Sequence, residues 1–161
     1  MTSTYHALDW IAAWGAAPDR PAEPDALAKF GNQTVRLIVR ASLGGSQLRI
    51  RLSNEHGTLP LRIGGAQLGM RQAGADLVPG SARALTFSGF ASVTVPPGAP
   101  MLSDPVVLMV PDQAELAVSL YFPGEIEAST VHANAGQTNY VSLPGNFSGA
   151  AVFPIQQRMY A

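Results

Sequence analysis

Three histidines have the most versatile chemistry in this 161-residue chain, because imidazole can act as a base, an acid or a metal ligand. They are His6, His56 and His132, too far apart to form a local metal motif such as two histidines four residues apart. Three unrelated polar or loop histidines are therefore the favoured interpretation. The chain has no cysteine, which excludes thiolate catalysis, disulfides and cysteine-based metal sites. We expect neither a metal site nor a cofactor.

The hydroxyl and carboxyl groups point to no catalytic site either. Ser46 follows two glycines, but Leu48 stands where the closing glycine of a G-x-S-x-G nucleophile motif belongs. Turn chemistry explains Gly-Gly-Ser fully, so a nucleophile role for Ser46 is disfavoured. Glu125 and Glu127 could mimic a paired-carboxylate site, yet they follow Pro-Gly in an evident loop, and solvated loop charge explains them better. We expect no catalytic residue in this chain.

Polar and aromatic side chains at strand ends remain as candidates for binding. Residues 53–57 end a strand with polar groups in a loop, and residues 131–140 gather a histidine, amides, a hydroxyl and an aromatic ring. Trp10 and Trp14 are either a stacking surface for a sugar or core anchors. The candidates for binding or for a substrate entrance are Trp14, Asn54, His56, His132, Gln137 and Tyr140.

The elements that position these side chains are predicted to be β-strands from residue 33 onward. Residues 34–40 are rich in branched side chains, and residues 47–53 alternate apolar and polar with period two. Together they predict an antiparallel hairpin that turns at residues 43–46. Further strands follow between Gly and Pro turns, at residues 61–70, 83–87, 91–95, 106–110, 116–122, 138–142 and 150–153.

This pattern predicts one all-β domain, an antiparallel β-sandwich that is jelly-roll-like. Residues 1–31 are expected to form an N-terminal arm with a Trp-containing strand at 10–14 and a proline-rich turn, and residues 32–161 the sandwich. Three prolines between residues 18 and 24 exclude a helix interior there, so residues 25–29 can form one helical turn at most.

Charge and hydropathy limit the kinds of partner and the location that this chain can have. Charged residues make up only 13% of the chain, against about 25% in a typical soluble domain, and a low-charge surface suits burial against a partner. A net charge of −1 and a single lysine, Lys29, argue against a nucleic-acid partner.

No apolar run approaches the roughly 20 residues that span a bilayer. Residues 1–14 lack the features of a signal peptide as written. The compartment stays open, with a secreted or periplasmic location favoured.

Several of these residues also carry a family resemblance. The opening Trp10-Ile-Ala-Ala-Trp14-Gly-Ala-Ala-Pro18 resembles the W-x-x-x-W-x-A-A-P opening of a group of bacterial SGNH (GDSL) hydrolases. The resemblance extends over nearly the whole chain, and its motifs are specific in combination. It continues through Asn32-Gln-Thr-Val-Arg36, Gly44-Gly45-Ser46, Arg49-Ile-Arg51-Leu-Ser-Asn54, Gly57, Val78-Pro-Gly80-Ser81, Leu85-Thr86-Phe87, Ser103-Asp104-Pro105, Leu116-Ala-Val-Ser-Leu120 and His132 to Thr138.

In that family the segment is an N-terminal β-sandwich-like region placed before an α/β/α catalytic domain. The G-D-S serine, the oxyanion-hole glycine and asparagine, and the late D-x-x-H of that domain do not occur here. Residues 157–161 fall about where the family leads into the catalytic domain. Serine ester hydrolase activity is therefore implied only together with that domain.

The resemblance implies an accessory domain that packs on the hydrolase and helps shape the entrance for acylated carbohydrates or other esters. Asn54, His56, His132 and Gln137 are expected nearest that entrance, and the Trp10–Trp14 strand is expected to pack on the catalytic domain. Two alternatives remain open: a free-standing carbohydrate-binding module, and a structural or oligomerisation domain.

Overall fold

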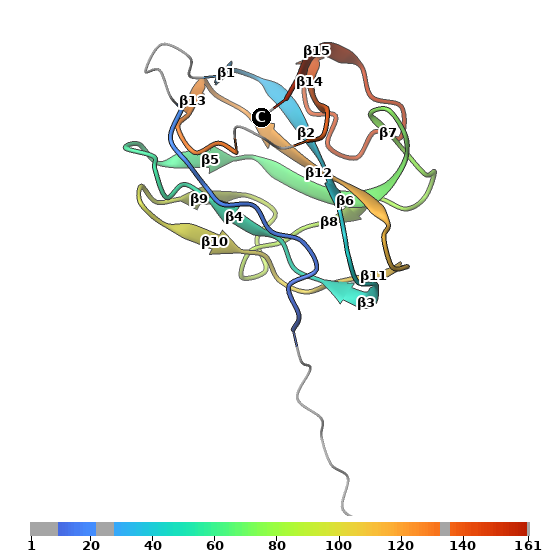
Figure 1. Ribbon diagram of the computed structural model, residues 1–161. Helices are drawn as coiled ribbons and strands as arrows, with labels where there is room; N and C mark the ends of the chain where they lie inside the picture. Colours follow the sequence, from blue (N-terminus) through green and yellow to red (C-terminus); the bar gives the residue numbers. More distant parts are fainter. Residues whose placement is uncertain (1–9, 22–27, 133–135, 161) are drawn as a thin grey trace, which may run out of the picture.

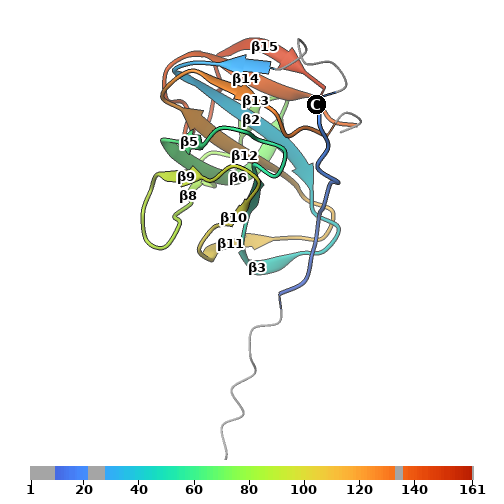
Figure 2. The same cartoon turned by 90° about the vertical axis from the view of Figure 1, so that its left-hand side faces the viewer.

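The computed structural model describes residues 10–21, 28–132 and 136–160. Among them every regular element is a β-strand and every strand pair is antiparallel. The strands form two layers, a long curled sheet and a set of short ribbons that face it (Figures 1 and 2). The predicted all-β, sandwich-like fold is confirmed.

The long sheet is built around two central strands, β2 (Gln33–Arg40) and β12 (Glu115–Phe122), which pair along their whole length. Both strands are buried on both faces, because the larger core covers one face and a smaller core covers the other. The sheet order is β15-β14-β2-β12-β6-β7, and β8 also pairs with β6. The outer strands are β6 (Gly65–Ala73), β7 (Asp76–Leu77), β8 (Arg83–Ala84), β14 (Asn139–Pro144) and β15 (Ile155–Met159).

Four two-stranded ribbons form the second layer. Their strands pair as β1 with β13, β4 with β10, β3 with β11 and β5 with β9. The bounds are β1 (Ala28–Phe30), β3 (Gly45–Leu48), β4 (Arg51–Ser53), β5 (Leu61–Ile63), β9 (Val93–Val95), β10 (Pro100–Leu102), β11 (Val106–Val110) and β13 (Ile126–Ala128).

Alternation along the central strands divides the apolar side chains between two cores. Val35 and Val39 of β2 belong to the larger core, which also contains the buried ribbon residues Leu52, Ile63 and Leu108. The opposite face of β2 contributes to a smaller core with residues from β7 and β14. The ribbons are thus fixed by burial of apolar surface against one face of the sheet.

The predicted hairpin between residues 34–40 and 47–53 is wrong. β2 pairs with β12 and β14, whereas β3 and β4 pair with β11 and β10 in the other layer. The chain leaves the sheet at Gly44, whose backbone approaches Val110 so closely that a Cβ would collide with the Val110 carbonyl. Period-two alternation reports that one face of a strand is buried, but it does not identify the strand beside it.

Other strand predictions succeed in part. Residues 106–110 form β11 as predicted, and strands also occur within the segments predicted at 61–70, 83–87, 91–95, 116–122 and 138–142. Residues 10–14 form no strand. Of the predicted helical turn at 25–29, residues 28 and 29 belong to β1 and the others lie outside the described residues.

The strand predicted at residues 150–153 is also wrong, and the last strand is β15. The segment is apolar because it covers the smaller core, to which Phe153 belongs. Its backbone hydrogen bonds go elsewhere: the Ala150 carbonyl accepts from Arg36, and the Ala151 carbonyl accepts from Leu77 N–H. Burial and strand pairing are separate properties, and the sequence pattern showed only the first.

Asp104 organises the exposed turn before β9. Its carboxylate accepts hydrogen bonds from Gly89 N–H at 2.8 Å, Thr86 Oγ1 at 2.7 Å and Ser88 N–H at 3.1 Å. Ser88 and Gly89 both have positive φ angles, 52° and 84°, so this turn needs external support. The Gly89 bond contributes most, followed by the Thr86 bond, to lowering the pKa of Asp104 below its usual value.

We expect Asp104→Asn to lower the melting temperature at pH 7 and to have a smaller effect in acid, as the pH falls toward the folded pKa of Asp104. A carboxyl group whose pKa is lower in the folded than in the unfolded chain stabilises the fold above its unfolded pKa of about 4, and that contribution disappears as the pH falls through the folded pKa. Thermal melts of the wild type and the variant across this range test the prediction. Glu125→Gln, at an exposed carboxylate that accepts no hydrogen bond in the described structure, is the matched surface control. An equal penalty at pH 7 and in acid would contradict the assignment.

Candidate functional site

Residues 10–21 form an arm that runs across the ribbon layer toward β13 (Figure 1). Near its start, the backbone N–H and the Oγ hydroxyl of Ser42 both donate to the Ala13 carbonyl, at 2.7 and 2.8 Å. Farther along, Asp19 and Val131 exchange two backbone hydrogen bonds of 2.8 and 2.9 Å. The arm is therefore held at two points, with residues 14–18 between them.

His56 and His132, 76 positions apart in the sequence, reach two consecutive carbonyls of the arm. The Nε2 atom of His56 lies 3.4 Å from the Pro18 carbonyl oxygen, and its Nδ1 accepts from Arg20 Nε at 3.4 Å. The Nδ1 atom of His132 lies 3.2 Å from the Ala17 carbonyl oxygen. The backbone N–H of His56 also donates to Thr130 Oγ1 at 3.0 Å. The two imidazoles thus hold the arm, a role that their sequence spacing does not reveal.

A cavity of about 360 Å³ lies beneath the arm, and we call it the inner cavity. Arm residues 14 and 16–18 form one wall, and apolar side chains of β2, β4, β12 and β13 form most of the rest. Asn54, Ser129, Thr130, His132 and Asn139 contribute polar groups. An apolar cavity with a few polar groups is the usual form of a small-molecule site.

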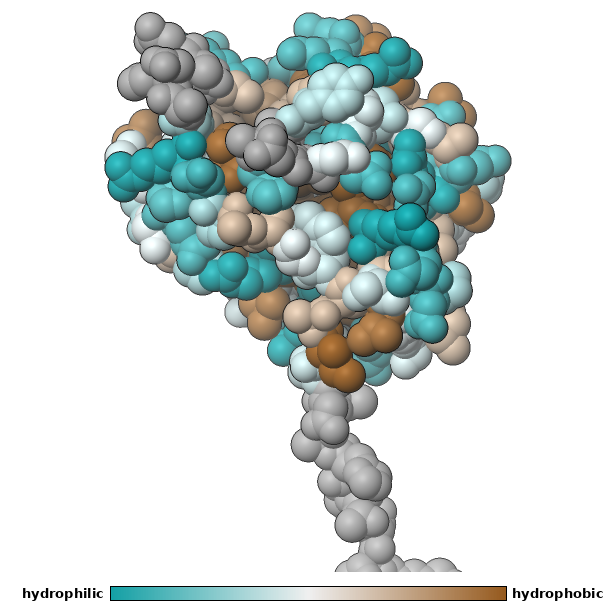
Figure 3. Space-filling model, in the orientation of Figure 1, coloured by the Kyte–Doolittle hydropathy of each residue, from teal (hydrophilic) through white to brown (hydrophobic). Residues whose placement is uncertain are grey.

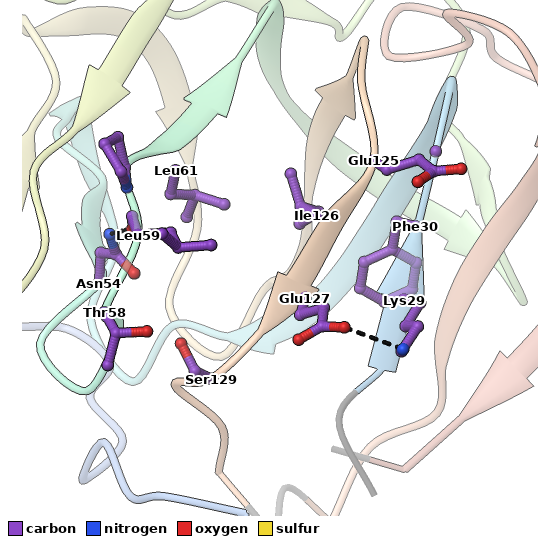
Figure 4. Close-up of a pocket in the computed structure, with 12 residues that line it drawn as sticks. Lys29, Phe30, Asn54, Thr58, Leu59, Leu61, Glu125, Ile126, Glu127 and Ser129 are labelled. Atoms are coloured by element: carbon purple, nitrogen blue, oxygen red, sulfur yellow. Dashed lines mark hydrogen bonds and ion pairs between the residues drawn. The ribbon is translucent and has the colours of Figure 1, made fainter. Parts of the chain in front are cut away.

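A second hollow of about 620 Å³, the outer groove, lies between the β1–β13 ribbon and residues 58–61. Figure 4 shows Leu59 and Leu61 on one side of the groove and Phe30 and Ile126 on the other. The two hollows adjoin, because six residues line both. They are Phe30, Asn54, Leu61, Ile126, Glu127 and Ser129.

The rim of the outer groove carries an ion pair. Lys29 Nζ lies 2.9 Å from Glu127 Oε1, and both side chains are mostly exposed (Figure 4). The hydrogen bond and charge of Glu127 raise the pKa of Lys29, with a smaller contribution from Glu125. Such an exposed pair contributes little to stability, but it neutralises the carboxylate that also lines the inner cavity.

Asn54 has a structural role at this site. The side chain is buried, and its Nδ2 donates to the carbonyls of Leu59, Val95 and Pro96 at 2.9, 3.1 and 3.2 Å. The backbone carbonyl of Asn54 accepts hydrogen bonds from the backbone N–H groups of Gly57 and Gly98. Asn54 lines both hollows, yet its amide nitrogen is committed to joining the loops at the end of β4 and β9.

Of the five candidates besides Asn54, three lie around the arm and two lie elsewhere. Trp14 lines the inner cavity with half of its surface still exposed, so four of the six candidates gather around the arm. Gln137 and Tyr140 line neither hollow. Tyr140 is a core residue of β14, packed in the smaller core, and it lies outside the site because alternation along the strand turns it to the far face of the sheet.

Residues that the sequence analysis did not single out complete the site. Ala17 and Pro18 supply the carbonyls that the histidines contact, and Thr130 supplies a hydroxyl beside them. In the sequence, only the motif-like opening at residues 10–18 indicated that the arm could be functional. No local pattern signals Thr130, because its position depends on the pairing of Asp19 with Val131.

In residues 10–21, 28–132 and 136–160, no group of three or more His, Asp or Glu side chains could hold a metal ion. Within the same ranges, no hydroxyl is hydrogen-bonded to a histidine ring. None of the described segments forms a helix long and apolar enough to cross a membrane.

Comparisons with known proteins add no family assignment. No protein-family model matches this chain, and a search of curated proteins finds no match.

Proposed function

We propose that this chain is the accessory β-domain of an SGNH/GDSL-type ester hydrolase and packs on a catalytic domain through its arm. The observation that carries the proposal is the exposure of large apolar side chains on a segment held by hydrogen bonds. Trp10, Ile11 and Trp14 are 44%, 70% and 54% exposed. The resemblance of residues 10–18 to the opening of those hydrolases supports the same surface.

The surroundings of the arm suit a protein partner. Figure 3 shows hydrophobic surface where the described part of the arm begins. Arg49 stacks on the Trp10 ring at 5.0 Å, so the indole is oriented as well as exposed. Oriented aromatic side chains with an apolar neighbour are typical of the centre of a protein interface. Because Trp14 also lines the inner cavity, a catalytic domain bound at this position would lie next to that cavity.

The proposal is tested by adding this chain to an isolated SGNH-type catalytic domain from a hydrolase whose N-terminal region resembles residues 10–18. We expect a one-to-one complex in analytical ultracentrifugation, and a changed KM for an aryl ester. The double variant Ile11→Ser/Trp14→Ala is expected to weaken the complex about tenfold or more, as loss of interface anchors does. Met109→Ser, an equally exposed apolar position on β11, is the matched control. Absence of a complex, or equal effects of the two variants, would contradict the proposal.

Carbohydrate binding is the second candidate function. The exposed rings of Trp10 and Trp14 favour it, because a sugar can stack on a flat indole face. Affinity electrophoresis of the chain alone in gels that contain soluble polysaccharides separates the two proposals. Retardation that is lost in Trp14→Ala would support the carbohydrate-binding module, whereas unretarded migration favours the accessory domain.

A further inference from the structure

We propose that the inner cavity binds the acyl chain of a neutral ester of medium length. The inference rests on the proposed function for the origin of the ester, but the binding is a property of this chain alone. The site has three features that select such a ligand: its apolar walls, its size and the neutrality of its lining.

The walls of the inner cavity are apolar over most of their extent. They come from both layers of the sandwich and include Phe30 and Phe122, whose rings stack with centroids 5.8 Å apart. The principal aliphatic lining residues are Val35, Leu37, Val39, Ile50, Leu52, Ile63, Val118, Leu120, Ile126 and Met159. These apolar walls contact methylene groups favourably, whereas the hydroxyls of a sugar would be desolvated against them without partners.

The volume fits a medium-length chain. A cavity of about 150 Å³ takes up benzene, and each water-sized group occupies about 30 Å³ of liquid volume. On that scale the 360 Å³ of the inner cavity corresponds to about a dozen non-hydrogen atoms. An acyl chain of about eight to ten carbons with its ester group has this size.

The charges that line the cavity are already neutralised. Arg51 lies 3.0 Å from Glu55, and Glu127 is paired with Lys29. A ligand carboxylate would therefore find no uncommitted cation among the lining residues and would lie near the Glu127 carboxylate. A neutral ester avoids both problems, which is why the ester is favoured over the free acid.

Polar groups near the arm can receive the ester. Thr130 Oγ1 accepts a hydrogen bond from His56 N–H and donates none that is recorded in the described structure, so its proton can go to an ester carbonyl. His132 approaches the Ala17 carbonyl through Nδ1, which leaves its Nε2 for other contacts. The ligand is thus oriented with its ester near residues 130–132 and its alkyl chain among the core side chains.

The arm contributes a wall that can report on binding. Trp14 lines the cavity, and Trp10 is the only other tryptophan in the chain. In the Trp10→Phe variant, Trp14 is the single indole fluorophore. Bromine quenches indole fluorescence on contact, so a bromoalkyl ester makes occupancy of the cavity visible in the intact chain.

The test titrates methyl 10-bromodecanoate into the Trp10→Phe chain and follows Trp14 fluorescence. We expect saturable quenching, with about tenfold weaker binding of 10-bromodecanoic acid at neutral pH. Adding Ala128→Phe fills the cavity and is expected to weaken ester binding by at least about tenfold. Ala84→Phe, on the exposed strand β8, is the control and should leave binding unchanged.

A second variant distinguishes the loss of one binding group from misfolding of the chain. Thr130→Val is similar in shape and removes only the hydroxyl, so we expect weaker ester binding but unchanged binding of 1-bromodecane. Quenching that is linear and identical in the filled and control variants, or no quenching at all, would overturn the inference. Ester binding without a complex with the catalytic domain would leave this site standing and remove the accessory role, and the reverse result would do the opposite.

Discussion

Replacement of Arg36 by methionine is expected to lower the free energy of unfolding by about 3–5 kcal/mol, one of the largest effects of any single substitution in this chain. The side chain is fully buried in the middle of β2. Its guanidinium donates to Ser119 Oγ at 2.8 Å and lies 4.2 Å from the centroid of the Phe153 ring. Its remaining donors go to the carbonyls of Ala75, Phe147, Ser148 and Ala150, at 2.7–3.3 Å.

The size of the effect follows from what the substitution leaves behind. The buried carbonyls of Ala75 and Ser148 would lose a charge-assisted donor, and each unsatisfied buried group costs about 1–3 kcal/mol. The partly buried carbonyls of Phe147 and Ala150 would lose the same donor, although the Phe147 carbonyl keeps its hydrogen bond from Ala150 N–H. Burial itself opposes the charge, since desolvation lowers the pKa of Arg36 to about 10. Removal of that desolvation penalty offsets part of the loss, so the sum stays below four times the cost of one group.

Chemical denaturation followed by circular dichroism measures this effect, and two further variants sharpen it. Arg40→Met removes an exposed arginine from the same strand and is expected to change stability by less than about 0.5 kcal/mol. Arg36→Lys should recover little, because an ammonium group cannot reproduce the planar fork that reaches four carbonyls. If Arg36→Met is as stable as Arg40→Met, the network does not hold the 147–150 loop on the sheet.

Asn54→Ala is the second large prediction, with an expected loss of about 2–3 kcal/mol. The substitution leaves the carbonyls of Leu59, Val95 and Pro96 without the Nδ2 donor. Asn54→Asp keeps the shape but places a carboxylate against three carbonyl oxygens, so we expect it to be at least as destabilising at pH 7. Thermal and urea unfolding of both variants test the prediction.

The matched control for Asn54 is Gln137→Ala, an amide residue that lines neither hollow. We expect its stability to stay within about 0.5 kcal/mol of the wild type. If Asn54→Ala matched this control in stability but lost ester binding, Asn54 would be a ligand-contacting residue and its structural role would be refuted. The prediction thus separates the two roles that a polar residue at a loop end can have.

The sequence predicted the class of the fold well and the pairing of its strands poorly. Alternation at residues 47–53 and the Gly and Pro turns indicated a two-faced β-structure, which the protein has. The hairpin with residues 34–40 failed because the close approach of Gly44 to Val110 sends the chain into the opposite layer. Contacts of this kind join residues 66 positions apart, and no local pattern encodes them.

The candidate site shows the same division. Trp14, Asn54, His56 and His132 were singled out by residue type and by their place at strand ends, and all four lie around the arm. Gln137 and Tyr140 were singled out on the same grounds, but neither lines the two hollows. Tyr140 instead packs in the smaller core. Residue type identifies which side chains can bind, whereas burial and direction depend on packing against distant strands.

By itself, the sequence determined an all-β chain with alternating faces, low charge and no cysteine, because these properties reside in composition and short-range periodicity. Only the tertiary structure decided that Arg36 is buried in a ring of carbonyls and that Asn54 joins loops. It alone placed two distant histidines on one arm above an apolar cavity. The reason is physical: these arrangements depend on long-range strand pairing and on which face of a strand meets the opposite layer.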